Sequence, residues 1–144
     1  MYKSHMRLAI EKAREADSAF GAVLAMGDQV AVSVSDADPA QYDPTGHAIL
    51  QALRELGKLT HEIRFPGYSL YTTVEPCPMC AAACITAHLE AVYFGIALEE
   101  LSLGQERYPE ALSASKIFNL HQNPPALGGG ILADECRELL HFIQ

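Results

Sequence analysis

Two cysteines three positions apart, Cys77 and Cys80, constrain this chain most strongly, because proline stands on both sides of the first one. Pro78 suits the first position of a helix, where its missing N–H costs no hydrogen bond. The N–H groups of such a first turn lower the pKa of nearby thiols and favour the thiolate form. The segment is therefore predicted to present two thiolates at a helix N-terminus, either as metal ligands or as a redox pair.

A histidine thirty residues upstream of Cys77 favours the metal. The segment from Asp43 to Ala48 is predicted to open a second helix, with His47 in its first turn. Two cysteines and one histidine leave the fourth tetrahedral position of zinc open for water, which is typical of catalytic sites. We therefore predict that His47, Cys77 and Cys80 bind one Zn²⁺. Cys84, one turn further on, is predicted to be a small buried side chain and not a fourth ligand.

Composition limits the class of protein. With 144 residues, 49% hydrophobic and 19% charged, the chain is predicted to form one globular domain over residues 1–144. It has no apolar run long enough for a membrane span and does not begin like a secretory signal, and its four cysteines suit a reducing compartment. A cytoplasmic protein is expected. The net charge of −8 favours a small-molecule partner over nucleic acid.

Hydrophobic periodicity predicts an α/β fold with a sheet of about five strands between helical layers. We expect the zinc ion between the two ligand helices. The remaining histidines have no ligand-like neighbours and are expected on the surface or in packing roles. The predicted helices cover residues 2–17, the segment ending at Gly57, residues 79–85 and residues 131–142; the predicted strands cover 20–26, 30–35, 68–74, 91–96 and a segment near Ile117–Phe118, with a glycine-rich break at 127–130.

Five segments together give the chain a resemblance to a known family. Its His47 and Pro76-Cys77-Pro78-Met79-Cys80 resemble the zinc signature of the cytidine deaminase-like family, in particular the branch of nucleobase, nucleoside and tRNA-adenosine deaminases. The resemblance implies a three-layer α-β-α fold of the CMP/dCMP deaminase type that usually pairs as a homodimer. The segments follow the family's order and span nearly the whole chain: residues 20–23, 43–45, 73–80, 92–95 and 130–136.

Residue 49 departs from the family pattern. The family has glutamate two residues after the zinc histidine, where this chain has Ile49. That glutamate moves protons from the attacking water to the ring nitrogen and the leaving amine, which isoleucine cannot do. Glu75 is the carboxylate nearest in sequence to the metal ligands. It is a candidate replacement, and the more remote candidates are Glu99, Glu100 and Glu135.

The resemblance also assigns two residues to the substrate. Phe20 borders the substrate pocket, and the position of Asp36 is usually an asparagine that bonds substrate. An ionised aspartate only accepts hydrogen bonds, whereas asparagine also donates. Asp36 therefore selects a ligand with more donors, or it has lost this role and is a solvated turn residue.

Three functions remain open. The first is hydrolytic deamination of a small amino-purine or amino-pyrimidine, of the guanine or cytosine type, with an impaired or displaced proton shuttle. The second is a catalytically inactive subunit that partners an active homologue. The third is a ligand-binding descendant of the fold.

Overall fold

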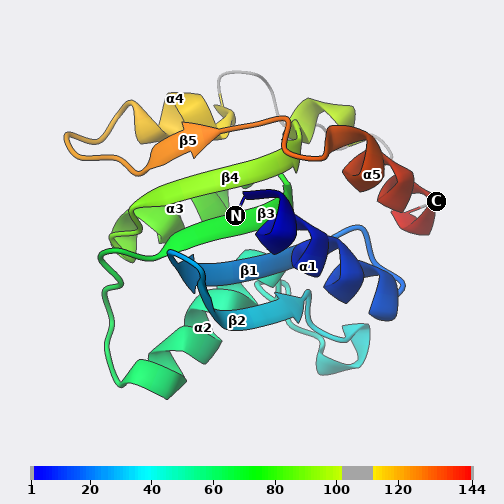
Figure 1. The fold of residues 1–144 in the computed structure, drawn as a ribbon, viewed down its shortest axis with the longest axis horizontal. Coiled ribbons are helices and arrows are strands. Elements are labelled where there is room, and N and C mark those ends of the chain that lie inside the picture. Colours follow the sequence, from blue (N-terminus) through cyan, green and yellow to red (C-terminus); the bar gives the residue numbers. More distant parts are fainter. Residues whose placement is uncertain (1, 102–111, 144) are drawn as a thin grey trace.

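The structure is a computed structural model that describes residues 2–101 and 112–143. One five-stranded sheet forms its centre, in the order β2-β1-β3-β4-β5 (Figure 1). Strand β1 is antiparallel to both β2 and β3, whereas β3, β4 and β5 run parallel. The predicted sheet of about five strands is therefore confirmed, and its strand pairing is mixed. The strands are β1 (Gly21–Met26), β2 (Gln29–Ser35), β3 (Ser69–Val74), β4 (Ala91–Ile96) and β5 (Ala126–Gly128).

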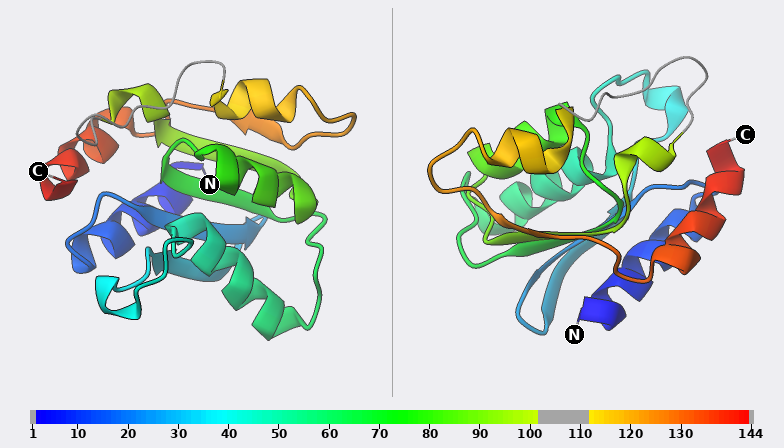
Figure 2. Two further views of the ribbon diagram at one scale, coloured as in Figure 1. Left: turned by 180° about the vertical axis from the view of Figure 1, so that it is seen from behind. Right: turned by 90° about the horizontal axis from the view of Figure 1, so that it is seen from above.

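Helices cover both faces of the sheet, as the view from above shows (Figure 2). Helices α1 (Tyr2–Glu15) and α5 (Ala133–Glu138) lie on one face. Helices α2 (Ala48–Thr60), α3 (Pro78–Thr86) and α4 (Ala114–Phe118) lie on the other, which confirms the three-layer α-β-α fold. Short 3₁₀ helices are η1 (Pro39–Gln41), η2 (Leu98–Glu100) and η4 (Leu139–Ile143). Among the described helices, none has the length and apolar character needed to cross a bilayer.

Helix α1 packs closely on the centre of the sheet. Its buried side chains recur at helical spacing, so one apolar stripe faces the strands. A Cβ atom at Gly21 would collide with the carbonyl of Ala9, so only glycine fits where β1 begins. The stripe consists of His5, Met6, Ala9, Ile10 and Ala13.

The strand predicted near Ile117–Phe118 is wrong, because these residues form the end of α4. The Ser113 side chain accepts a hydrogen bond from the backbone N–H of Lys116 and caps the helix. The two buried residues of α4, Ala114 and Phe118, are four positions apart. This is the spacing of one helical turn and not the alternate spacing of a strand.

The fifth strand lies instead at Ala126–Gly128, within a segment predicted to be a glycine-rich break. A Cβ atom at Gly129 would collide with the ring of Phe94, so glycine lets the backbone lie against the aromatic side chains of β4. The final helix is also shorter than predicted, since α5 ends at Glu138 and η4 follows it.

The prediction that this helix ends at Gly57 is wrong, because α2 continues to Thr60. The left-handed residue that ends it is His61, whose φ is 59° and whose backbone N–H bonds the Gly57 carbonyl.

Two glycine substitutions are expected to change stability in opposite directions. Gly21→Ala should lower the free energy of unfolding by about 1–3 kcal/mol, because the added methyl group overpacks the contact with Ala9. Gly57→Ala should raise it by about 0.5–1 kcal/mol, because the site has ordinary space and a helical backbone. Urea unfolding of the zinc-loaded variants measures both. Equal effects of the two substitutions would contradict this packing.

Candidate metal centre

The two cysteines lie where β3 passes into α3. Cys77 is the N-cap residue of α3, with φ −69° and ψ 170°, and Pro78 takes the first helical position as predicted. The Ala81 N–H bonds the Cys77 carbonyl at 2.7 Å, which closes the first turn and brings Cys80 back beside Cys77. Both side chains are buried.

His47 reaches the same point from the start of α2. It is the N-cap residue, with φ −66° and ψ 150°, and so precedes the first turn in which it was predicted. The preceding loop is fixed to the end of β2, because the Ala37 N–H bonds the Gly46 carbonyl at 2.7 Å. This bond joins the segment that carries His47 to the segment that carries Asp36.

The three side chains converge closely enough for one ion. The Nδ1 atom of His47 is 3.5 Å from the sulfur of Cys77 and 3.5 Å from the sulfur of Cys80. All three potential ligand atoms lie within 4.8 Å of one another. Zinc bonded to nitrogen at about 2.0–2.1 Å and to sulfur at about 2.3 Å, at a tetrahedral angle, separates the two atoms by about 3.5–3.6 Å. The residues therefore fit tetrahedral zinc.

The electrostatics of the group favour a thiolate. The hydrogen bond from Cys80 lowers the pKa of Cys77 to about 4; burial opposes this shift and the contact with His47 adds to it. The same contact raises the pKa of Cys80, because the two sulfurs share one proton. The hydrogen bond with Cys77 in turn raises the pKa of His47. A divalent cation would replace the shared proton.

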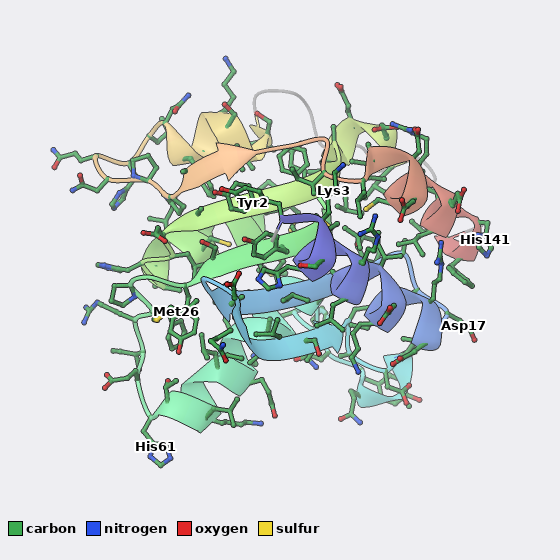
Figure 3. The ribbon with its side chains drawn as sticks, viewed as in Figure 1. Tyr2, Lys3, Asp17, Met26, His61 and His141 are labelled. Atoms are coloured by element: carbon green, nitrogen blue, oxygen red, sulfur yellow. The ribbon has the colours of Figure 1, made fainter. Side chains whose placement is uncertain are left out.

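Other candidate ligands lie apart from this group. Cys84 is fully buried, and burial raises the pKa of its thiol to about 12, so it stays a neutral packing side chain. The ring of His5 bonds the Gly27 carbonyl at 2.9 Å. His61 stands at the far end of α2 and points away from the molecule (Figure 3). Within residues 2–101 and 112–143, only His47, Cys77 and Cys80 form a group of this kind.

A cavity of about 310 Å³ adjoins the three ligands. Phe20 and Asp36 both line it, where the sequence predicted a substrate pocket, and so does Ile49, which is 5% exposed. Leu98 and Leu101 were not predicted for the site, and they add to an apolar wall. The lining residues are Phe20, Asp36, His47, Ala48, Ile49, Thr72, Val74, Glu75, Pro76, Cys77, Cys80, Leu98 and Leu101.

Glu75 lines the cavity but is held by the backbone. One carboxylate oxygen accepts the Leu98 N–H at 3.1 Å and the other accepts the Ala114 N–H at 2.8 Å. Glu75 thus joins the end of β3 to η2 and α4, which is a structural role. The more remote candidates, Glu99, Glu100 and Glu135, are not among the lining residues of the cavity. Glu100 instead forms an ion pair with Arg137 at 2.7 Å.

Comparison with known proteins decides the family. The model of the cytidine and deoxycytidylate deaminase zinc-binding region matches residues 1–96. The chain belongs to this family. Its metal is zinc, which the geometry of His47, Cys77 and Cys80 fits.

Two relatives of this deaminase-family chain are both named for tRNA adenosine, and one of them is named as probably inactive. A tRNA-specific adenosine deaminase of Buchnera aphidicola is 29% identical over 140 residues, which are 94% of this chain and 88% of the relative. Over 78 residues, or 51% of this chain and 19% of the relative, the chain is 35% identical to a mouse protein named probable inactive tRNA-specific adenosine deaminase-like protein 3.

Solved structures show the same fold. One, from a study of A-to-I editing by tRNA:A34 deaminases, superposes with a TM-score of 0.81 at 29% identity, over 95% of this chain and 99% of that one. A guanine deaminase from Nitrosomonas europaea shares the fold with a TM-score of 0.80 at 18% identity, over 98% and 84% of the two chains. The comparisons point to a hydrolase acting on C–N bonds. The relatives named for tRNA reopen the prediction, made from net charge, that nucleic acid is not the substrate.

Zinc retention should depend on the three ligands and not on the fourth cysteine. We expect one zinc ion per chain in protein prepared without chelator, and well under one in His47→Ala and Cys77→Ala. Cys77→Ala should also unfold at lower denaturant concentration, because metal binding contributes to folding free energy. The control Cys84→Ala should keep its zinc. Metal analysis by mass spectrometry checks all four proteins, and a zinc-poor wild type or control would contradict the ligand set.

Proposed function

We propose that this protein is a zinc-dependent deaminase of a small amino-purine or amino-pyrimidine, of the guanine, cytosine or adenosine type, with a proton shuttle displaced from residue 49. One observation carries the proposal: the three metal ligands open onto a cavity of about 310 Å³ that Phe20 and Asp36 also line. This volume is at the low end of ligand pockets, about 300–1,000 Å³, and suits one heterocycle.

In this proposal the metal and the residues that line the cavity have different roles. When bound, zinc lowers the pKa of a water molecule toward neutrality and so supplies the nucleophile. The apolar side chains of Phe20, Leu98 and Leu101 provide surface for a flat ring and reduce the access of bulk water. Asp36 offers a polar group to a ring N–H or amino group.

The charges around the cavity favour a small molecule over tRNA. A second cavity of about 600 Å³ shares Phe20 and Asp36 with the first, and Asp17 and Asp38 also line it. Neither cavity has a lysine or arginine among its described lining residues. A phosphate backbone at this opening would meet carboxylates without the basic contacts that bind nucleic acids. The net charge of −8 supports the same choice.

Ile49 limits the rate in this proposal. It is an apolar side chain on the cavity wall, at the position where the family pattern places the proton-carrying glutamate. Loss of a positioned proton shuttle costs about 10²–10⁴ in rate. We therefore expect the wild type to turn over its substrate at least about a hundredfold below the median enzyme value of about 10 s⁻¹.

Substitution Ile49→Glu should raise kcat by about a hundredfold or more, because it puts a proton carrier beside the metal ligands. Ammonia release should be measured with zinc-loaded protein on guanine, cytosine, cytidine, adenosine and a tRNA transcript. The matched control is Ile49→Gln, which has nearly the same shape as the glutamate but cannot carry a proton, and its rate should stay near that of the wild type.

Two results would contradict this proposal. Ordinary wild-type turnover that Ile49→Glu does not improve would show that residue 49 is not the missing carrier. Deamination of the tRNA transcript alone would overturn the choice of a small molecule.

A second function is favoured by one specific observation. The cavity has an intact group of zinc ligands beside an apolar Ile49, as expected of an inactive subunit that binds an active homologue. A relative bears the name of a probable inactive deaminase. No activity on any substrate in either the wild type or Ile49→Glu would favour this function. A homodimer stays a prediction under both proposals.

A further inference from the structure

Two cavities meet at the side chains of Phe20 and Asp36. The metal cavity, of about 310 Å³, is the one that the three ligands line, and the outer cavity, of about 600 Å³, lies beside it. Among the described lining residues, only Phe20 and Asp36 belong to both cavities. These two residues therefore form the wall between the space beside the metal ligands and the larger space outside it.

The backbone of Phe20 is held on both sides. Its N–H donates to the hydroxyl oxygen of Ser18 at 3.0 Å, and its carbonyl oxygen accepts the hydroxyl of Ser35 at 2.7 Å. The same two hydroxyl groups donate to Oδ1 of Asp36, at 2.7 Å from Ser18 and 2.8 Å from Ser35. Both halves of the wall are thus tied to one pair of serines, and movement of either half would break some of these bonds.

The segment around Phe20 is also fixed to the sheet. The hydroxyl of Thr73 on β3 donates to the Ala19 carbonyl at 2.7 Å and accepts the Gly21 N–H at 3.1 Å. Thr73 is fully buried, so a displaced partner would leave its hydroxyl unsatisfied, which is costly. Since the backbone on each side of Phe20 is bonded to a core strand, the fold sets the point from which the phenyl ring projects.

We propose that Phe20 is a specificity-determining residue, a partition that makes this site select free nucleobases and reject their nucleosides. This inference rests on the proposed function. The volume of the metal cavity is at the low end of ligand pockets, and further space lies on the other side of Phe20. A free base fits beside the metal ligands, whereas the sugar of a nucleoside would have to pass the fixed wall to reach the outer cavity.

The outer cavity offers partners for a sugar once the wall is opened. Asp17 and Asp38 line it, and carboxylate groups accept hydrogen bonds from hydroxyl groups. Asp36 lines both cavities and stays at the opening when the side chain of Phe20 is shortened. Removal of the phenyl ring should therefore create nucleoside binding, and not only weaken the binding of bases.

Equilibrium dialysis of the zinc-loaded protein tests the partition without turnover. The probes are cytosine and cytidine, adenine and adenosine, and guanine and guanosine. In at least one pair, the wild type should bind the base about tenfold or more tightly than its nucleoside, since even one misplaced methylene group costs that much in a close-fitting pocket. Phe20→Ala should lower this ratio by about tenfold or more, with a loss of base affinity of about tenfold or less.

Three further variants separate the partition from a general loosening of the site. Phe20→Leu keeps apolar bulk and should keep most of the selectivity, whereas Phe20→Val should give an intermediate ratio even if the alanine variant does not fold. Ala16 lines the outer cavity and not the metal cavity. In the Phe20→Ala background, Ala16→Phe should therefore remove the gained nucleoside binding and leave base binding unchanged. Each folded variant should hold one zinc ion per chain.

The outcomes distinguish this partition from the proposed function. Equal affinities for base and nucleoside in the wild type, a ratio that Phe20→Ala leaves unchanged, or no binding of any probe would overturn the partition. Selective binding that follows Phe20, without ammonia release even in the Ile49→Glu background, would keep the partition and reject the proposed function. Equal ammonia release from bases and nucleosides would keep the function and overturn the partition.

Discussion

The convergence of one imidazole nitrogen and two sulfurs is the interaction on which the rest of the site depends. The distance of 3.5 Å from His47 Nδ1 to each sulfur requires the starts of α2 and α3 to meet on one face of the sheet. Two further contacts maintain this meeting: the bond from Ala37 to Gly46 holds the segment before α2, and Glu75 holds the end of β3 to η2 and α4. The same contacts shape the cavity wall, so the metal ligands and the pocket are built together.

The metal ligands of this fold are separate from the carboxyl groups that line the cavity. The ligand set is complete without any carboxylate, and Ile49 beside it adds only apolar surface. A chain can therefore keep its zinc, its pocket and its stability after its proton carrier has changed. Asp36 is fixed by Ser18 and Ser35, outside the two ligand helices. This part of the cavity wall therefore belongs to the β1–β2 side of the pocket and not to the zinc motif.

The parts of the structure that follow from local chemistry could be predicted. Strand β4 begins and ends where predicted, because its apolar run is buried in the sheet. The turn from β3 into α3 follows from Pro78 and the cysteine spacing. Helix α4 and strand β5 could not be placed, since Glu75 holds the first residue of α4 and Phe94 lies against Gly129, and no periodicity displays these distant contacts. The same limit applies to Glu75, whose partners are 23 and 39 residues away, and to Ser18, which bonds Asp36 from 18 residues away.

The most direct test is the X-ray absorption spectrum of the zinc-loaded wild type at the zinc edge. We predict two sulfur neighbours at about 2.3 Å and two lighter atoms at about 2.0–2.1 Å, one of them an imidazole nitrogen. This pattern means that His47, Cys77 and Cys80 leave one position of the ion open to the cavity. Three or four sulfur neighbours, or a spectrum without imidazole scattering, would contradict it and describe a closed structural site.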